Sequence, residues 1–447
     1  MGNAKFPVAG YDNRMSALLT RRTDKNRRLA IQHWDRKCLH AYQCERLNEL
    51  LSVMLPENRF YAKKLAGFAG DKFDSLERII DFPFTTKDEL NDPGHNDVGY
   101  AANLTWDVDR YCRFHRTSGT RGRPMIVLDT VDDWQWWMEG WQYVLDQAEL
   151  TEADRVVMAF SFGPFIGFWS AFDAAIERGA LVAPTGAMST VARLDLLASI
   201  EATILFCTPS YALHLLEVAA EQKIDMASSK LRSIVVAGEP GGSLPQVRSR
   251  IEQGFDATVV DHSGASEVGP WGFPNSAGSG IHVNEAQFVA EFRSLETDAP
   301  AVEGELSELV LTTLGRVGCP VVRYRTRDLV RPVWDHESDC KFVLLDGGVL
   351  GRTDDMMIIR GVNVFPTSIE QIVRGFPDVD EYRMTAFRGS AMDQLKIEVE
   401  DRLDDPSRIA QALQSQLGLR VEVTAVELGS LPRFEAKGKR FIDRREL

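Results

Sequence analysis

Between residues 155 and 255 the sequence alternates between short apolar runs and longer amphipathic stretches, and this alternation constrains the fold more than any other feature. The apolar runs have the length and the β-branched content of buried strands, and they cover residues 155–160, 180–183, 203–206 and 233–237. Stretches with helical periodicity separate or follow them, at residues 168–177, 190–200, 210–221 and 244–253. Strands that alternate with helices predict an α/β fold with a doubly wound sheet.

Small and polar residues follow each predicted strand. These turns read Phe160-Ser-Phe-Gly-Pro164, Cys207-Thr-Pro-Ser210, Ala237-Gly-Glu-Pro240 and His262-Ser-Gly-Ala-Ser-Glu267. In doubly wound sheets, ligands bind beyond the carboxyl ends of the strands. We therefore expect these four turns to converge on one binding crevice.

The sequence predicts two structural units. A large N-terminal domain covers residues 1–350, of which the first 90 are mostly helical, with a helix from residue 27 into residues 47–55. Residues 351–447 form a small C-terminal α+β domain. Its expected strands and helices lie at residues 395–399, 421–423, 368–374 and 407–417. A chain of 447 residues has room for two such units.

Composition argues against several classes of protein. A net charge of −14 does not suit sequence-independent nucleic-acid binding, which needs clustered Lys and Arg. The six cysteines are scattered without a C-x-x-C pair, as in reduced cytoplasmic proteins, and offer no evident zinc site. There is no apolar signal region and no apolar run of about 18 residues. We therefore expect a cytoplasmic protein that neither binds nucleic acid nor spans a membrane.

A glycine-rich loop, Thr117-Ser-Gly-Thr-Arg-Gly-Arg-Pro124, lies between two predicted strands. Gly119 and Gly122 allow backbone N–H groups to turn toward an anion. Ser118 and Thr120 add hydroxyl donors, and two arginines add positive charge. The loop predicts a phosphate cradle, with a plain hairpin turn as the alternative. It does not have the spacing of a Walker A loop.

Charged residues also mark other turns and strand ends. Glu267 follows a Gly-containing turn and is a candidate Mg²⁺ ligand, because hard cations take oxygen ligands; a solvated loop acid is the alternative. Asp328 ends Arg323-Tyr-Arg-Thr-Arg-Asp328, where alternation puts three arginines on one side. It is a candidate acceptor for ribose hydroxyls, or part of a solvated edge strand. Residues 351–361 suit a hinge between the units, or a turn into a hairpin. Residues 433–440, taken alone, have the composition of a solvated basic tail.

In order and spacing, these motifs resemble the adenylate-forming superfamily of acyl-CoA synthetases, carrier-protein adenylation domains and luciferases. Within it the chain is similar to phenylacetate-CoA ligase and its relatives, over about residues 80–445. The motifs that carry the resemblance are Pro83-Phe-Thr-Thr-Lys-Asp88, Cys207-Thr-Pro-Ser-Tyr211, Arg323-Tyr-Arg-Thr-Arg-Asp328 and Asp354-Asp-Met-Met-Ile-Ile-Arg-Gly-Val-Asn-Val-Phe-Pro366.

The resemblance implies an activity. A carboxylic acid, expected to be aromatic or arylacetic, is activated by ATP to an acyl-adenylate. Its acyl group then passes to the thiol of coenzyme A, and AMP and pyrophosphate are released. ATP, Mg²⁺ and coenzyme A are the implied cofactors, and the C-terminal domain is implied to be mobile. A carrier-protein phosphopantetheine as acceptor, a non-catalytic nucleotide-binding relative and a homodimer stay open.

The resemblance also implies roles for residues at matching positions. Lys437 takes the position of the catalytic lysine, with Lys439 as the alternative, and Glu267 helps to hold Mg²⁺. The residues expected at the nucleotide are Ser118, Gly119, Thr120, Gly122, Glu239, Pro240, Ser266, Asp328 and Arg352. The residues expected at the acid pocket are Phe162, Tyr211, Gly264 and Trp271. Asp354 is the implied hinge residue, and Gly361 is implied to face the CoA channel.

Some positions depart from the family pattern. Arg121 and Arg123 stand where the family usually has Thr and Lys. Ser263 stands where an aromatic residue usually stacks on adenine. Residues 270–276 contain none of the cysteines that bind zinc in some relatives. These departures concern nucleotide and metal binding rather than the fold.

Overall fold

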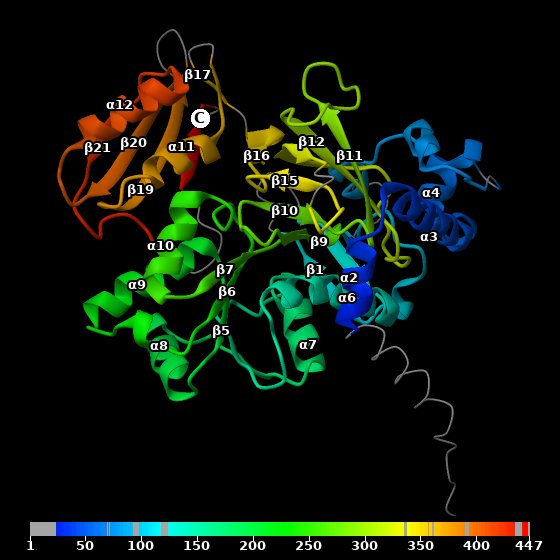
Figure 1. Ribbon diagram of the computed structural model, residues 1–447. Coiled ribbons are helices and arrows are strands. Elements are labelled where there is room, and N and C mark those ends of the chain that lie inside the picture. Colours follow the sequence, from blue (N-terminus) through cyan, green and yellow to red (C-terminus); the bar gives the residue numbers. More distant parts are fainter. Residues whose placement is uncertain are drawn as a thin grey trace, which may run out of the picture.

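A five-stranded parallel sheet forms the centre of the large unit in the computed structural model (Figure 1). The residues described are 24–68, 70, 72–92, 98–117, 124–334, 338–355, 357–359, 362–388, 393–433 and 440–445. The strand order is β4-β3-β5-β6-β7. The strands are β3 (Arg155–Met158), β4 (Leu181–Pro184), β5 (Ile204–Cys207), β6 (Ser233–Val236) and β7 (Thr258–Asp261). The connecting helices are α7 (Trp169–Glu177), α8 (Thr190–Ser199), α9 (Pro209–Glu221) and α10 (Pro245–Phe255). The predicted doubly wound α/β fold is confirmed.

Alternate residues of these strands face two separate hydrophobic cores, because successive side chains of a strand point to opposite sides of the sheet. Val156 and Phe206 belong to the core formed with α6 (Val131–Gln147) and α7. Val157 and Leu205 belong to the core formed with α8, α9 and α10. Helices therefore cover both faces of the sheet, which leaves its edges and strand ends as the places for a site.

Antiparallel sheets and a hairpin stand beside the parallel sheet. One sheet has the order β14-β15-β10-β9-β8 and a second has the order β11-β12-β13-β16, while β1 and β2 form the hairpin. The strands of the first sheet are β8 (Ser263–Ala265), β9 (Gly269–Pro274), β10 (Gly280–Val283), β14 (Pro332–Val333) and β15 (Leu344–Asp346). Those of the second are β11 (Phe288–Ser294), β12 (Ser307–Thr313), β13 (Tyr324–Val330) and β16 (Gly351–Arg352). The hairpin strands are β1 (Arg113–Arg116) and β2 (Ile126–Asp129).

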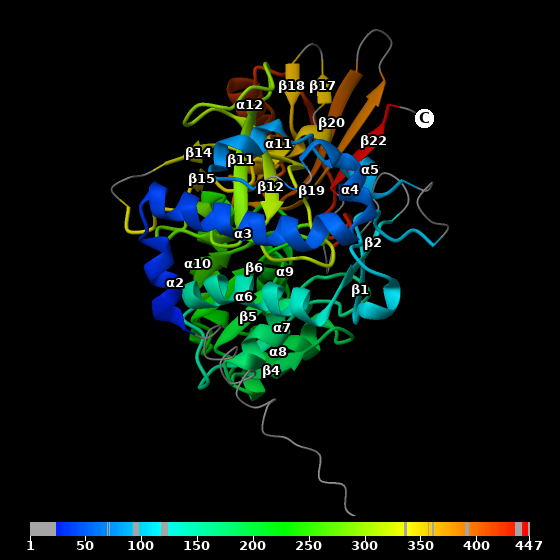
Figure 2. The ribbon, with the colours of Figure 1, turned by 90° about the vertical axis from the view of Figure 1, so that its right-hand side faces the viewer.

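The N-terminal helices lie across one side of the large unit, and α3 is drawn above α6 in the view of Figure 2. They are α2 (Lys25–Gln32), α3 (Arg36–Glu57), α4 (Arg59–Lys64) and α5 (Lys87–Leu90). The single helix predicted from residue 27 is in fact two helices. The break occurs because Asp35 caps α3 by accepting a hydrogen bond from the N–H of Cys38 at 2.7 Å. None of the helices in the described part of the chain has the length and apolar character that a bilayer crossing requires.

The C-terminal sheet has the order β21-β20-β19-β22 and a core of its own. Its strands are β19 (Val379–Arg388), β20 (Asp393–Asp401), β21 (Glu422–Ala425) and β22 (Phe441–Arg444). The helices α11 (Pro366–Arg374) and α12 (Pro406–Leu417) pack on it, and the short strands β17 (Met357–Ile359) and β18 (Val362–Val364) pair with each other. The sheet lies beside α9 and α10 of the large unit (Figure 1).

Candidate active site

The turns after β3, β5, β6 and β7 lie together beyond the carboxyl ends of these strands, because the four strands run side by side in one direction. Two of these turns are joined directly. The backbone N–H of Ser210, in the first turn of α9, donates to Oε1 of Glu239 at 2.8 Å. Glu239 and Pro240 follow β6, and His262 follows β7. Polar groups of adjacent turns therefore meet beyond the strand ends.

Glu267 is held by residues from two distant parts of the chain. The ammonium of Lys87 and the hydroxyl of Tyr324 both donate to its Oε1 atom, each at 2.9 Å. The side chain is buried, and burial by itself raises the pKa of a carboxyl group. The Lys87 ammonium, together with hydrogen bonds from a backbone N–H and the Tyr324 hydroxyl, more than offsets this effect and holds the pKa of Glu267 below its ordinary value. Glu267 is therefore a buried carboxylate anion beside a cation.

The donor set at Glu267 fits Mg²⁺. Proteins usually hold this ion through one or two carboxylates together with substrate phosphates and water. Within the described residues, no group of three or more His, Cys, Asp or Glu side chains is arranged to hold a metal ion. An ion at Glu267 would therefore take most of its ligands from phosphate oxygens and water, as Mg²⁺ commonly does.

Arg316 links the strand after the glycine-rich loop to the turn that contains Glu267. Its guanidinium is fully buried, and its Nε lies 2.7 Å from Oδ1 of Asp129, the last residue of β2. Its Nη1 donates to the backbone carbonyl of Ser266 at 3.0 Å. Loss of either charge would leave the other buried and unpaired, which costs about 3–5 kcal/mol. The backbone of Ser266 is therefore fixed relative to β2.

Asp328, Arg352 and Asp354 form one ion-pair network. Asp328 and Arg352 are cross-strand partners in β13 and β16, and Nη1 of Arg352 lies 3.1 Å from Oδ1 of Asp328. Nε of Arg352 donates to Oδ1 of Asp354 at 3.0 Å. Burial lowers the pKa of Arg352, but Asp328 and Asp354 together raise it above its ordinary value. Two residues predicted at the nucleotide and the predicted hinge residue therefore lie in direct contact.

Alternation along β13 predicts three arginines on one side of the strand, and this prediction is only partly right. Arg323 and Arg325 both stack on the ring of Phe84, at 4.1 and 4.5 Å from its centroid. Arg327 instead pairs with Asp88, at 3.0 Å. Its φ of +65° and the irregular pairing of β13 with β12 interrupt the regular alternation. The strand is also internal to its sheet, so a solvated edge strand is excluded.

Two of the residues predicted at the acid pocket lie at accessible positions. Phe162 follows β3 and is half-buried, with its ring edge-on to Trp169 at 4.7 Å between centroids. Gly264, in β8, is exposed. A Cβ atom there would lie 2.9 Å from the carbonyl oxygen of Gly269, so a larger residue would disturb the pairing of β8 with β9.

The other two predicted pocket residues lie inside hydrophobic cores. Tyr211 is fully buried under α8, and its hydroxyl accepts a hydrogen bond from Nη1 of Arg193 at 2.6 Å. Trp271, in β9, is 1% exposed. Large aromatic side chains bury the most apolar area and are drawn into cores for that reason. In this structure neither ring has accessible surface to offer a ligand.

Several predicted residues lie outside the described part of the chain. They are Ser118, Gly119, Thr120, Arg121, Gly122, Arg123, Gly361, Lys437 and Lys439. The residues on either side of the glycine-rich loop are described. The N–H of Thr117 donates to the carbonyl of Met125 at 3.0 Å, and the N–H of Met125 donates to Oγ1 of Thr117 at 3.0 Å. The pairing of β1 with β2 therefore continues to Thr117 and Met125, on either side of the loop.

Sequence reasoning missed three residues of this region: Lys87, Arg316 and His262. Lys87 lies within the motif at residues 83–88, so a signal for it was present. The ring of His262 lies against that of Trp141 in a tilted arrangement with 4.0 Å between ring centroids, and its Nδ1 donates to the carbonyl of Gly272 at 2.7 Å. Burial lowers the pKa of His262 to about 4, so its imidazole is neutral near pH 7. His262 begins the turn at residues 262–267 that was expected at the crevice, whereas nothing in the local sequence marks Arg316.

Two separate stretches of the sequence match models of known protein families. Residues 57–299 match the model of the AMP-binding enzyme family, and residues 361–445 match that of the AMP-binding enzyme C-terminal domain. The first match covers more than half of the chain. The chain therefore belongs to the AMP-binding enzyme family, the adenylate-forming enzymes, as the sequence motifs predicted.

Within this family the chain is similar to acid–CoA ligases. Phenylacetate-coenzyme A ligase of Escherichia coli (strain K12) is 30% identical over 427 residues, which cover 92% of this chain and 95% of that protein. A solved structure of 2-hydroxyisobutyryl-CoA ligase, in the postadenylation state with 2-HIB-AMP, has a TM-score of 0.83 at 26% identity and covers 90% of this chain and 89% of that one.

The same ligase in the thioesterification state, with 2-HIB-AMP and CoA, has a TM-score of only 0.67 at 26% identity, over 93% of this chain and 92% of that one. Sequence and coverage are nearly the same in both comparisons, so the difference lies in how the parts of the ligase are arranged. The present structure has the arrangement that is more similar to the postadenylation state.

Proposed function

We propose that this protein is an AMP-forming acid–CoA ligase. ATP activates a carboxylic acid to an acyl-adenylate, and the acyl group then passes to the thiol of coenzyme A. The relatives named above supply the reaction class. We place the reaction in the cytoplasm, because ATP and coenzyme A are available there.

The observation that carries this proposal is the arrangement of two polar groups along β13. Tyr324 contacts Glu267, and Asp328 lies four residues further along the strand, paired with Arg352. Because β13 bulges between Arg325 and Leu329, the stretch from Tyr324 to Leu329 lies opposite only three steps of β12, Leu311 to Glu308, which span roughly 10 Å. This length suits a nucleotide whose ribose hydroxyls bind Asp328 and whose polyphosphate extends toward Glu267 and Lys87.

In the first half-reaction a carboxylate oxygen attacks the α-phosphorus of ATP. A bond forms between that oxygen and phosphorus, and the bond from the α-phosphorus to pyrophosphate breaks. Both reactants are anions, so the main task of the protein is to offset their repulsion. An ammonium at about 4 Å from an anion supplies on the order of 4 kcal/mol at an effective dielectric constant near 20. Lys437 and Lys87 are the cations that we assign to this task.

Glu267 would hold Mg²⁺, which when bound neutralises charge on the phosphates. The carboxylate is kept ionised by Lys87, as its lowered pKa indicates. Arg316 fixes the backbone of the turn through Ser266. The protein therefore supplies a preorganised anionic group for the ion and keeps water away from one side of it by burial.

In the second half-reaction the sulfur of coenzyme A attacks the acyl carbon. A carbon–sulfur bond forms, the carbon–oxygen bond to AMP breaks, and the thiol proton leaves to solvent. For this step we propose that residues 351–447 turn about Asp354 and bring Gly361 to the CoA channel. The contacts of Asp354 with Arg352, at 3.0 Å, and with Arg327, at 3.5 Å, lie at this junction and are the ones that such a motion would change.

An arylacetic or other aromatic acid is the substrate class that we propose. Aromatic side chains follow β3, where Phe162 contacts Trp169 and Phe172 edge-on. Such rings offer T-shaped contacts to an aromatic acid. The exposed Gly264 leaves room for a ring next to the turn after β7.

The test is acid-dependent exchange of pyrophosphate into ATP, measured over a panel of arylacetic, benzoic and short aliphatic acids. We expect exchange with arylacetic acids and release of AMP only when coenzyme A is added. Exchange that leads to AMP release only with a carrier protein would replace the acceptor in this proposal. The absence of exchange with every acid would favour a nucleotide-binding protein without ligase activity.

A further inference from the structure

Two buried glutamates lie directly opposite each other in the C-terminal sheet. Glu381 of β19 and Glu400 of β20 are cross-strand partners in the antiparallel register. Directly opposed residues share one face, with Cβ atoms about 5 Å apart. Their exposed fractions are 3% and 0%. Two buried like charges at this spacing repel each other unless each has its own cation.

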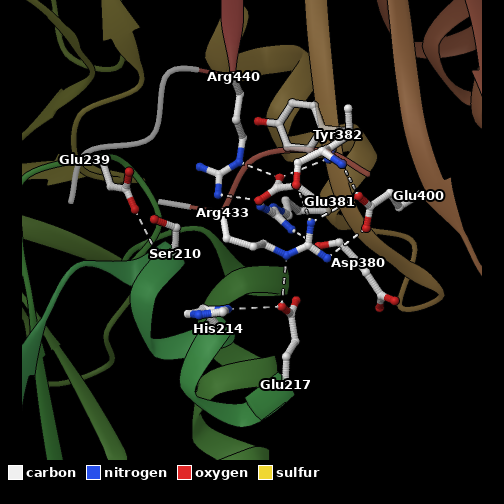
Figure 3. A network of polar contacts seen from close by, with 12 residues as sticks. Ser210, His214, Glu217, Glu239, Asp380, Glu381, Tyr382, Glu400, Arg433 and Arg440 are labelled. Atoms are coloured by element: carbon white, nitrogen blue, oxygen red, sulfur yellow. Dashed lines mark hydrogen bonds and ion pairs between the residues drawn. The ribbon is translucent and has the colours of Figure 1, made fainter. Parts of the chain in front are cut away.

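Each glutamate has an arginine partner of its own, in a two-pronged ion pair (Figure 3). Nη1 and Nη2 of Arg433 lie 3.1 and 2.8 Å from the two carboxylate oxygens of Glu400. Nε and Nη2 of Arg440 lie 2.6 and 2.9 Å from those of Glu381. Burial raises the pKa values of both glutamates, but the arginines hold them below their ordinary range. Both carboxylates are therefore ionised. Glu400 is paired with Arg433, whereas Glu381 is paired with Arg440 and also accepts a hydrogen bond from Nη2 of Arg374 at 3.2 Å.

The two arginines flank residues 434–439, the segment that contains Lys437. Further backbone contacts fix the chain on both sides of it. The N–H of Leu431 donates to Oε1 of Glu400 at 2.6 Å, and the carbonyl of Arg440 accepts from the N–H of Met384 at 2.7 Å. The chain thus leaves the sheet at one member of the glutamate pair and returns to it at the other.

Arg433 also contacts the large unit. Its Nε lies 3.3 Å from Oε2 of Glu217 on α9, and Nδ1 of His214 lies 3.5 Å from the same oxygen. Figure 3 shows Arg433 between Glu217 on α9 and Glu400 on the C-terminal sheet. The first turn of the same helix holds Ser210, which is bonded to Glu239 beyond β6. One arginine therefore joins the C-terminal sheet to the helix that begins at the candidate site.

We propose that Arg433 and Arg440, with Glu400, Glu381 and Glu217, are positioning residues for the adenylation half-reaction. We name this set the glutamate clamp. It fixes both ends of the segment that carries Lys437 and docks one end on α9 in the arrangement seen here. The inference rests on the proposed function for the role of Lys437, whereas the contacts of the clamp do not depend on it.

The clamp should matter for adenylation and not for thioester formation, because only the first step uses Lys437 in this arrangement. Glu400→Gln and Glu217→Gln each remove one charge and keep the shape of the side chain. We expect each to lower acid-dependent pyrophosphate exchange roughly tenfold, as displacement of a reacting group does. Formation of the thioester from supplied acyl-adenylate and coenzyme A should be unchanged. Glu217 lies on the surface of α9, so its variant should fold even if Glu400→Gln does not.

Glu398→Gln is the matched control. Glu398 lies on the same strand, two residues from Glu400, and pairs with the cross-strand residue Arg383 at 2.7 Å. Among the described residues, neither member of this pair forms a hydrogen bond or ion pair with Arg433 or Arg440. We expect the control to exchange pyrophosphate at the wild-type rate.

A double-mutant cycle with Lys437→Ala separates positioning from a general loss of structure. If the clamp acts through Lys437, adding Glu400→Gln to Lys437→Ala should lower exchange by at most about twofold further, because the two changes remove one shared function. A further tenfold loss, or an equal loss in both half-reactions, would overturn the proposal.

If the wild type activates no acid, the proposed function is wrong, but the contacts of the glutamate clamp can still be tested by hydrogen–deuterium exchange. Amides of residues 431–440 should exchange faster in Glu400→Gln than in Glu398→Gln, with equal unfolding midpoints. Equal rates of hydrogen–deuterium exchange in the two variants would show that the clamp does not hold this segment.

Discussion

The Nζ atom of Lys87 lies 2.9 Å from Oε1 of Glu267, although the two residues are 180 positions apart in the chain. The lysine is the first residue of α5, and the glutamate lies in the turn between β8 and β9. This contact brings the N-terminal region into the candidate site. In the proposed reaction Lys87 is a second cation, besides Lys437, that offsets the repulsion between ATP and the acid.

Lys87→Met removes that charge and keeps a long side chain. We expect acid-dependent pyrophosphate exchange to fall roughly a hundredfold, as loss of one preorganised donor to a charged transition state does. Lys64→Met is the control, since Lys64 is in a nearby helix and pairs with Glu89 rather than with Glu267. Equal rates in the two variants would mean that Lys87 does not contribute to adenylation.

Asp328→Ala should weaken recognition of the ribose. A hydrogen bond to a charged partner is worth about 1.5–3 kcal/mol, so we expect the KM for ATP to rise roughly tenfold or more. The preference for ATP over its 2′- and 3′-deoxy analogues should also be lost, which steady-state kinetics with each nucleotide will measure. Asp88→Ala is the control, because Asp88 is exposed and pairs with the neighbouring Arg327. An unchanged preference in Asp328→Ala would place the ribose elsewhere.

Lys437→Ala should lower adenylation by at least roughly a hundredfold, as loss of a transition-state charge donor does. Thioester formation from supplied acyl-adenylate should be much less affected. Comparison with Lys439→Ala decides which lysine has the role, since the two lie two positions apart. A loss confined to Lys439→Ala would move the assignment by these two residues.

The sequence predicts much of the fold because the parallel sheet depends on local periodicity. The strand that became β5 and the helix that became α9 are visible as an apolar run and a helical stretch, and both are present in the structure. Asp328 and Arg352 were each expected near the nucleotide from motifs that stand out in the sequence, but the ion pair between them was not predicted. Hydrophobic periodicity is a property of ten to twenty consecutive residues, so elements that depend on it can be predicted from the sequence.

Contacts between distant segments were not predictable in this way. Arg316 reaches Asp129, 187 positions away, and nothing around either residue indicates the other. The type of residue also misled at Tyr211, since an aromatic residue near a strand end was expected at a pocket and lies in a core instead. Proximity in sequence to a strand end does not determine toward which side a side chain points.

Asp261 supplies a test that depends on pH and not on catalysis. Burial raises the pKa of its carboxyl group from 3.8 to about 6, although a hydrogen bond from Ser243 Oγ, at 2.6 Å, acts in the opposite direction. A raised pKa in the folded state means that the folded protein binds the proton more tightly than the unfolded chain does. Asp261 therefore contributes stability that is fully present below pH 3.8 and is lost as the pH rises through about 6.

Asp261→Asn cannot ionise, so it should escape this loss. Relative to the wild type, the variant should gain stability steadily between pH 4 and pH 7, by up to about 3 kcal/mol at the upper end, since one pKa unit corresponds to about 1.4 kcal/mol. Urea unfolding of both proteins at several pH values in this range measures the difference. Asp195→Asn, at an exposed position of α8, is the control and should follow the wild-type curve. If the Asp261→Asn curve runs parallel to that of the wild type, the carboxyl is ionised at no free-energy cost, and a cation or water outside the described contacts must stabilise it.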